Sequence, residues 1–282
     1  PEFRGVRLHL NPRILKPLLV YSLPMVVIGF AGMVNEMLDR AILKFLLPYD
    51  LSTNLKMLGI YAACYKLSIL MTLFIQAFRY AGEPFFFSYA KRADAKKAYA
   101  VVMNYFVIFC VFIFLLVTLY IDLFQYFIGA EYRVGLGGVP ILLIANLFLG
   151  IYVNLSIWYK LSDRTGMGAW VSLGGALLTV VLNLWWIPLW GYFGSAWATL
   201  VCYAGMALVA YLLGRRYYPV QYDWAKIFGY LGLGLALYGT DQYAVIIQGF
   251  PPWLCGTVGL GAYLLIAAAV DFRPLLQQRT VA

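Results

Sequence analysis

The stretch VPILLIANLFLGIYVNLSIWY, residues 139–159, contains no charged side chain. A helix of about 20 apolar residues is long enough to cross the ~30 Å hydrocarbon core of a bilayer. Apolar stretches of the same kind recur along the chain, and each predicts a membrane-spanning helix. We therefore predict an all-α, polytopic membrane helical bundle with about eight transmembrane helices, at 17–47, 57–89, 98–120, 139–159, 167–187, 193–213, 224–239 and 253–270.

The composition excludes an ordinary soluble domain, because 63% of the residues are hydrophobic and only 12% are charged. The formal net charge of +9 would by itself suit a nucleic-acid-binding protein. The basic residues lie mainly in short connections between apolar stretches, however, and so indicate membrane topology and no nucleic-acid partner. The longest connection, at 121–138, suits either a short helix at the membrane surface or a plain loop.

Lysine and arginine are sorted between the two sets of alternate connections. Fifteen of the 21 basic residues lie in or beside one set, whereas the opposite set holds only Lys56 and Arg133. Basic connections are retained in the cytoplasm during insertion, so we expect this set and both chain termini to be cytoplasmic and the number of crossings to be even. The set comprises Arg4, Arg7, Arg13, Lys16, Lys91, Arg92, Lys96, Lys97, Lys160, Arg164, Arg215, Arg216, Lys226, Arg273 and Arg279.

Residues typical of metal sites and of catalysis are scarce. His9 is the only histidine and lies in the basic N-terminal segment, which excludes a histidine-based metal or catalytic cluster. The cysteines fall in or at the edge of apolar stretches without a close pair, and so predict small buried hydrophobic side chains: Cys64, Cys110, Cys202 and Cys255. The sequence contains neither a nucleotide-binding loop nor a G-x-S-x-G motif. We therefore expect no metal, no cofactor and no enzymatic activity.

Ionisable residues within spans are expensive in hydrocarbon and usually face a cavity or a partner. Here they are concentrated in the first two predicted spans: Glu36, Asp39, Arg40, Lys44, Lys66, Arg79 and Glu83. Basic residues slightly outnumber acidic ones in this set, which favours a polar cavity whose arginine and lysine side chains hold an anionic head group. The alternative is that Glu36–Arg40 and Arg79–Glu83 form neutralising pairs, each within its own helix.

The depths of these residues favour one shared site. At about 1.5 Å per residue, Asp39 lies about 12 Å and Lys66 about 13–14 Å inside the outer ends of their predicted helices. Antiparallel neighbours would therefore place Asp39, Arg40 and Lys66 at similar depth. Pro24 and Pro84 add kinks or stops in the same hairpin, and kinked helices around a polar cavity suit alternating access.

Four stretches carry a resemblance to a known family. Residues 183–200 read NLWWIPLWGYFGSAWATL. After an asparagine, Pro188 and Gly191 predict a tight hairpin, and the small residues that follow allow close helix packing. The others are MVNEMLDRAIL at 33–43, LGIYAACYKLS at 58–68, and the block at 131–169. With these motifs the chain resembles, over nearly its whole length, the bacterial polysaccharide flippases of the multidrug/oligosaccharidyl-lipid/polysaccharide superfamily. The positions that match the hairpin motif of that family are Asp39, Arg40, Gly59, Tyr61, Tyr65 and Lys66.

The resemblance implies two six-helix lobes around a central cavity. Residues 17–214 would be the second lobe and 215–271 an additional terminal helix pair, with cytoplasmic segments at 1–16 and 272–282. The first lobe is missing from the sequence, which starts at Pro1 without an initiator methionine. We therefore expect the C-terminal part of a longer protein, completed by a first lobe from the same chain or from a partner.

The resemblance also implies a function, namely flipping of a polyprenyl-pyrophosphate-linked oligosaccharide across the bacterial inner membrane for cell-surface polysaccharide biosynthesis. The expected partners are this lipid-linked oligosaccharide, membrane lipids and polysaccharide-assembly proteins. Candidate contacts of the pyrophosphate or of acidic sugars are Arg40, Lys66 and Arg79, and candidate ion-coupling residues are Glu36 and Asp39. Secondary cavity candidates are Lys44, Glu83, Tyr61 and Tyr65.

Two other classes of function stay open, and a third is disfavoured. A multidrug/cation antiporter of the same superfamily should have an acidic cavity, whereas basic residues slightly prevail here. A non-transporting lipid-binding scaffold would bind lipid without moving it between leaflets. A membrane-embedded polymerase or acyltransferase should show a long outer loop or an embedded histidine, and the sequence has neither.

Overall fold

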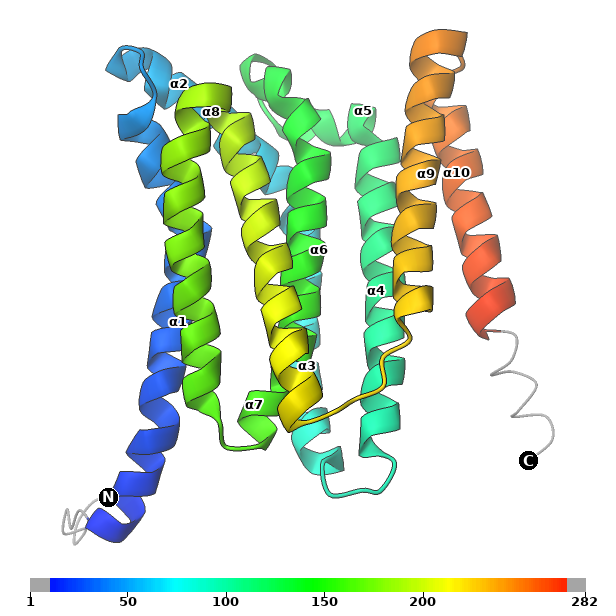
Figure 1. Ribbon diagram of the computed structural model, residues 1–282. Helices are drawn as coiled ribbons and strands as arrows, with labels where there is room; N and C mark the ends of the chain where they lie inside the picture. The colour runs from blue at the N-terminus through cyan, green and yellow to red at the C-terminus, as the bar shows by residue number, and fades with distance from the viewer. Residues whose placement is uncertain (1–10, 273–282) are drawn as a thin grey trace, which may run out of the picture.

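The computed structural model describes residues 11–272, which form helices and no strand (Figure 1). The predicted all-α bundle is therefore confirmed for this part of the chain, whereas residues 1–10 and 273–282, which hold parts of the predicted cytoplasmic segments, lie outside it. In chain order the elements are α1 (Pro12–Leu46), α2 (Leu51–Leu67), α3 (Ile69–Tyr89), α4 (Ala95–Leu119), α5 (Ile121–Phe124), η1 (Gln125–Phe127), η2 (Ala130–Gly138), α6 (Val139–Leu155), α7 (Ile157–Leu161), α8 (Thr165–Tyr217), α9 (Trp224–Gln248), α10 (Pro252–Ala267) and η3 (Ala268–Phe272).

The first helix starts earlier than the first predicted span. Asn11 caps α1 by accepting a hydrogen bond of 3.0 Å from the backbone N–H of Arg13. Pro12 occupies the first turn, where a backbone N–H would have no helical partner, so the missing N–H is tolerated. The helix predicted from Pro17 therefore extends back into the basic segment.

Five of the described helices are long and apolar enough to cross a membrane, or up to six if the bent pair α2–α3 counts as one span. They are α1, α4, Ala130–Leu161, α8 and Pro252–Asp271. The predicted total of about eight stays a prediction. The helix α9 is not among those found, and α8 is counted once although its chain turns back on itself.

The helix α8 is a hairpin with two arms, 165–190 and 192–217 (Figure 1). Gly191 breaks the helix with φ 59° and ψ −139°, a conformation that residues with a Cβ rarely adopt. Directly after the turn, a Cβ at Gly194 would lie 2.3 Å from the carbonyl oxygen of Trp186, so the two arms are in backbone contact. The tight hairpin predicted around Pro188 and Gly191 is confirmed.

The two sets of connections, one rich and one poor in lysine and arginine, lie at opposite ends of the bundle. The α3–α4, α7–α8 and α8–α9 connections share one end, whereas the α8 turn, α5 and the α9–α10 connection lie at the other (Figure 1). The sorting of lysine and arginine along the sequence thus corresponds to two physical ends of one structure. That the basic end is cytoplasmic stays a prediction.

The terminal helix pair is attached to the bundle through α4. Both α9 and α10 pack against α4, which also contacts α6 (Figure 1). Tyr263 of α10 is buried and donates a hydrogen bond of 2.6 Å to the carbonyl oxygen of Ile108. The helix α9 continues to Gln248, beyond the predicted end of its span at residue 239, and carries the buried side chain of Asp241.

The connection at 121–138 is not a plain loop. It consists of three short helical turns, α5, η1 and η2. Gly135 of η2 packs against α2, where the Cys64 thiol donates a hydrogen bond of 2.9 Å to its carbonyl oxygen. The cysteines are unbridged; Cys64, Cys110 and Cys202 are buried as predicted, whereas Cys255 is only partly buried.

Candidate functional site

One narrow face of α1 is buried in the bundle. Ala31, Asn35, Asp39 and Leu43 follow one another at four-residue intervals and are buried, as expected for one stripe of a helix that packs against α8. Glu36, by contrast, is exposed. The two acidic residues predicted as ion-coupling candidates therefore have different environments, and only Asp39 lies in the interior.

The carboxylate of Asp39 is held by donors from α1 and α2. The Tyr61 hydroxyl donates a hydrogen bond of 2.5 Å to Oδ2, and the Arg40 backbone N–H donates one of 2.6 Å to Oδ1. Asp39 and Tyr61 are each only 1% exposed. Buried carboxylates without hydrogen bonds are strongly disfavoured, so Tyr61 is a structural requirement of this position.

Further polar side chains from both arms of α8 surround this part of α1. The Thr179 hydroxyl donates a hydrogen bond of 3.0 Å to the Asn35 side-chain oxygen, whose amide nitrogen lies 3.6 Å from the Met206 sulfur. The Asn183 side-chain oxygen and the Ser195 hydroxyl are buried and have no hydrogen-bond partner within residues 11–272. Each arm of α8 therefore carries a buried polar atom without a hydrogen-bond partner in the described chain.

The predicted cations lie outside this interior. Arg40 is half-buried, donates a hydrogen bond of 2.9 Å to the Glu36 carbonyl oxygen, and lies 4.4 Å from the centre of the Tyr65 ring. Arg79 is half-buried, with its guanidinium 5.4 Å from the centre of the Tyr80 ring. Lys66 is exposed, in the last turn of α2. None of these three forms an ion pair within the described residues.

The neutralising pairs Glu36–Arg40 and Arg79–Glu83 do not form. Glu83 instead forms an ion pair with Lys160, which joins α3 to α7 at the basic end of the bundle. The side chain of Lys160 is only 12% exposed and that of Glu83 38%, so this contact is partly shielded from solvent. Glu83 is therefore engaged in holding two helices together, and the nearby Arg79 is left without an acidic partner in the described chain.

The structure brings together part of the predicted site. Asp39 meets Tyr61 and Arg40 meets Tyr65, so the predicted antiparallel pairing of α1 with α2 is confirmed at these two points. Lys44, which is half-buried, lies instead over the ring of the adjacent Phe45, at 5.0 Å. Lys66 and Arg79 make no polar contact with the Asp39 cluster.

Sequence reasoning missed the polar residues of α8 around α1. They carry a signal, because Thr179 and Asn183 are four residues apart in an apolar helix, as are Ser195 and Thr199, and such spacing places both members on one face. Within residues 11–272 no group of three or more histidine, cysteine, aspartate or glutamate residues is placed to hold a metal ion. The site as described is a buried polar cluster with one cation, Arg40, in contact with it, whereas Lys66 and Arg79 lie apart from it.

Comparison of the chain with protein-family models, with curated proteins and with solved structures found no match.

Proposed function

We propose that the chain is part of a membrane transporter that moves a lipid-linked anionic glycan between the two leaflets of a bilayer by alternating access. The observation that carries the proposal is the set of cations Arg40, Lys66 and Arg79, which lie at the surface of an apolar helical bundle without acidic partners in its described part. On the resemblance given above, the carrier lipid is a polyprenyl pyrophosphate and the membrane a bacterial inner membrane.

Energetics argue against exposure of these cations to lipid. An arginine or lysine at the centre of a spanning helix costs about 2.5–3.5 kcal/mol on insertion scales, and more without snorkelling or local water. A cavity filled with water or with an anionic head group removes most of this cost, because the charge is then solvated or compensated. Each of these positions therefore fits the wall of a polar cavity better than a lipid-facing surface.

The local geometry suits a phosphate ligand. Arg40 uses one guanidinium nitrogen on the Glu36 carbonyl oxygen and keeps further N–H donors free, and arginine binds phosphate through two parallel hydrogen bonds. Lys66 lies beside the break between α2 and α3, which are bent by 51° relative to each other. Broken helices of this kind line substrate sites in transporters, whereas helices that face the lipid stay regular.

We assign ion coupling to Asp39 and not to Glu36. Asp39 is buried on the face of α1 that packs against α8, so loss or gain of a proton or a small cation there would change the packing between the two helices. Glu36 is exposed and lacks such a connection. A buried carboxylate that links two helices is the type of element that couples an ion gradient to helix movement.

The test is transport in proteoliposomes by the purified chain reconstituted together with the first lobe that the resemblance implies. A polyprenyl-pyrophosphate-linked sugar with a fluorescent label is added, and its movement between leaflets is followed by a quencher confined to the outside. We expect faster movement than in protein-free vesicles, and lower rates for Arg40→Gln, Lys66→Gln and Arg79→Gln. Lys97→Gln is the matched control, because Lys97 is an exposed cation in the first turn of α4.

Three outcomes contradict the proposal. Movement no faster than in protein-free vesicles, with the labelled lipid bound, would indicate a lipid-binding scaffold. An equal loss of rate in Lys97→Gln would indicate a general effect of surface charge. Uptake of a cationic dye that depends on Asp39, without movement of the labelled lipid, would favour the multidrug/cation antiporter.

A further inference from the structure

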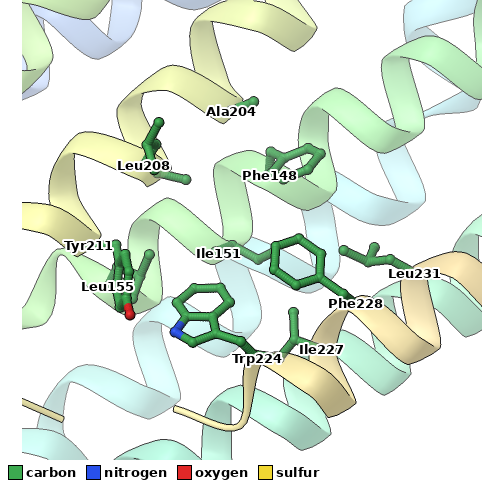
Figure 2. Close-up of a pocket in the computed structure, with 11 residues that line it drawn as sticks. Phe148, Ile151, Leu155, Ala204, Leu208, Tyr211, Trp224, Ile227, Phe228 and Leu231 are labelled. Carbon is green, nitrogen blue, oxygen red and sulfur yellow. The ribbon is translucent and has the colours of Figure 1, made fainter. Parts of the chain in front are cut away.

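An apolar groove runs between α6, the second arm of α8 and α9, and has a volume of about 420 Å³ (Figure 2). The helix α6 forms its floor with Phe148, Ile151 and Leu155. The two walls are formed by Ala204, Ala207, Leu208 and Tyr211 of α8, and by Trp224, Ile227, Phe228 and Leu231 of α9. Leu208 and Phe228 are exposed, so the groove opens to the outside of the bundle.

The groove is extended along α9. An adjoining apolar recess of about 310 Å³ lies between α4, α6 and α9 and shares Phe148, Phe228 and Leu231 with the groove. Neither lining includes an acidic or basic side chain. A long, flexible hydrocarbon chain fits such a surface, because every contact is apolar and none requires a fixed polar group.

The groove ends at aromatic rings and a cation. Tyr211 and Trp224 meet edge to face, with their ring centres 4.6 Å apart. A narrower recess then continues from Leu155 and Tyr211 to Arg215 and Tyr222. Arg215 is exposed, with its guanidinium 5.9 Å from the centre of the Tyr211 ring, and it forms no ion pair within residues 11–272.

The other cations near this end have different surroundings. Lys226, in the first turn of α9, forms an ion pair with Asp271, whose second carboxylate oxygen accepts a hydrogen bond of 2.5 Å from Tyr230. Arg216 lies over the Tyr217 ring, at 5.7 Å, and is not part of the groove lining. Arg215 is the cation that lines the narrow recess itself, whereas Lys96 contacts only the ring of Tyr218 there.

We propose that this groove binds an anionic phospholipid, with an acyl chain along α6 and the phosphate on Arg215. Charge complementarity selects this occupant, since an apolar channel that ends in an unpaired guanidinium matches a hydrocarbon tail that ends in a phosphate. Tyr211 and Trp224 lie where the head group begins, which is the preferred position of amphipathic rings. The proposal requires a membrane location but not the transport function, because Arg40, Lys66 and Arg79 lie on α1, α2 and α3.

Native mass spectrometry of the full chain in detergent tests the site. The probes are phosphatidylglycerol and phosphatidylcholine with identical acyl chains, which differ in net charge. We expect several-fold greater retention of phosphatidylglycerol by the unmodified chain. Arg215→Gln should abolish this preference, and Arg216→Gln, the matched neighbour outside the groove, should keep it.

A second pair of variants tests the tail. Ala204→Phe fills the groove and should remove bound lipid of both kinds, whereas Leu212→Phe adds bulk to an exposed position outside the lining and should leave retention unchanged. Circular dichroism checks that each variant keeps its helices. Equal retention of the two lipids by the unmodified chain, equal effects of the two arginine variants, or normal retention in Ala204→Phe would each overturn the proposal.

Discussion

The hydroxyl of Tyr61 donates a hydrogen bond of 2.5 Å to the carboxylate of Asp39, and this contact ties α2 to α1 inside the bundle. Both side chains are buried, so water cannot replace either partner. Removal of the hydroxyl therefore leaves a carboxylate oxygen with one donor fewer in a low-dielectric environment. A change in this pair should therefore affect both the stability of the protein and the proposed ion coupling through Asp39.

Tyr61→Phe tests the structural part of this relationship. The ring is kept and only the donor is lost, so we expect destabilisation by about 1–3 kcal/mol, the usual cost of an unsatisfied buried polar group. The measurement is thermal unfolding in detergent. Tyr49→Phe is the control, because Tyr49 is exposed and its loss of a hydroxyl should leave the melting temperature unchanged. Equal melting temperatures for the two variants would show that the hydrogen bond contributes nothing.

Gly194→Ala should damage the α8 hairpin. Its Cβ would lie 2.3 Å from the Trp186 carbonyl oxygen, and a backbone atom cannot move aside as a flexible side chain can. We expect a loss of about 1–3 kcal/mol, typical of overpacking. Gly205→Ala on the same helix is the matched control, because its Cβ would meet Leu178 at an ordinary 3.7 Å. Helix propensity alone should stabilise that control by up to about 1 kcal/mol, so effects of opposite sign are expected in thermal unfolding.

The ion pair between Glu83 and Lys160 should stabilise the contact between α3 and α7. Lys160 is largely buried, so Glu83→Gln leaves a shielded ammonium without its partner and should lower stability by more than a surface pair, by about 1 kcal/mol or more. A double-mutant cycle with Lys160→Gln measures the coupling. Arg79→Gln is the control, since Arg79 has no ion pair in the described chain. A coupling energy near zero would show that the contact is incidental.

The sequence predicted those features that depend on local pattern. The pairing of α1 with α2 was predictable in outline, because a short connection makes the two helices antiparallel, although the depth argument matched Asp39 with Lys66 and the observed partner is Tyr61. The α8 turn was predictable from Pro188 and Gly191, since a backbone position with positive φ favours glycine. Both inferences require only neighbouring residues and the geometry of a helix.

Features that depend on distant packing were not predictable. The partner of Glu83 is Lys160, which is remote in sequence, whereas the four-residue spacing offers only Arg79, the partner in the alternative interpretation. The second half of α9 was missed because Thr240, Asp241 and Gln242 lower the hydropathy, while in the structure the helix continues and buries Asp241. Hydropathy describes solvent preference, whereas burial depends on which neighbours cover a residue.

The N-cap of α2 should make the stability of the folded protein weakly dependent on pH in the acidic range. Asp50 accepts hydrogen bonds from Ser52 and Thr53, and these lower the pKa of its carboxyl to about 2. A carboxyl whose pKa is lower in the folded than in the unfolded state stabilises the folded state at pH values above the unfolded pKa of about 3.9. This contribution is lost as the pH falls towards the folded pKa. We expect the difference in melting temperature between the unmodified chain and Asp50→Ala to be constant above pH 5 and to shrink below pH 4. Asp50→Asn, which caps without titrating, should show no such change against Asp50→Ala.

Asp39→Asn should separate coupling from transport. Asparagine can keep both contacts, because its side-chain oxygen accepts from the Arg40 backbone N–H and its amide nitrogen donates to the Tyr61 hydroxyl oxygen. The variant should therefore fold, but it can neither release a proton nor balance a cation. In proteoliposomes with an imposed proton or sodium gradient, we expect the variant to move the labelled lipid at a rate that no longer responds to the gradient. Glu36→Gln, at an exposed position on the same helix, should keep most of the response. If Glu36→Gln removes the response and Asp39→Asn keeps it, the coupling site lies on the exposed face of α1, and the buried cluster serves stability alone.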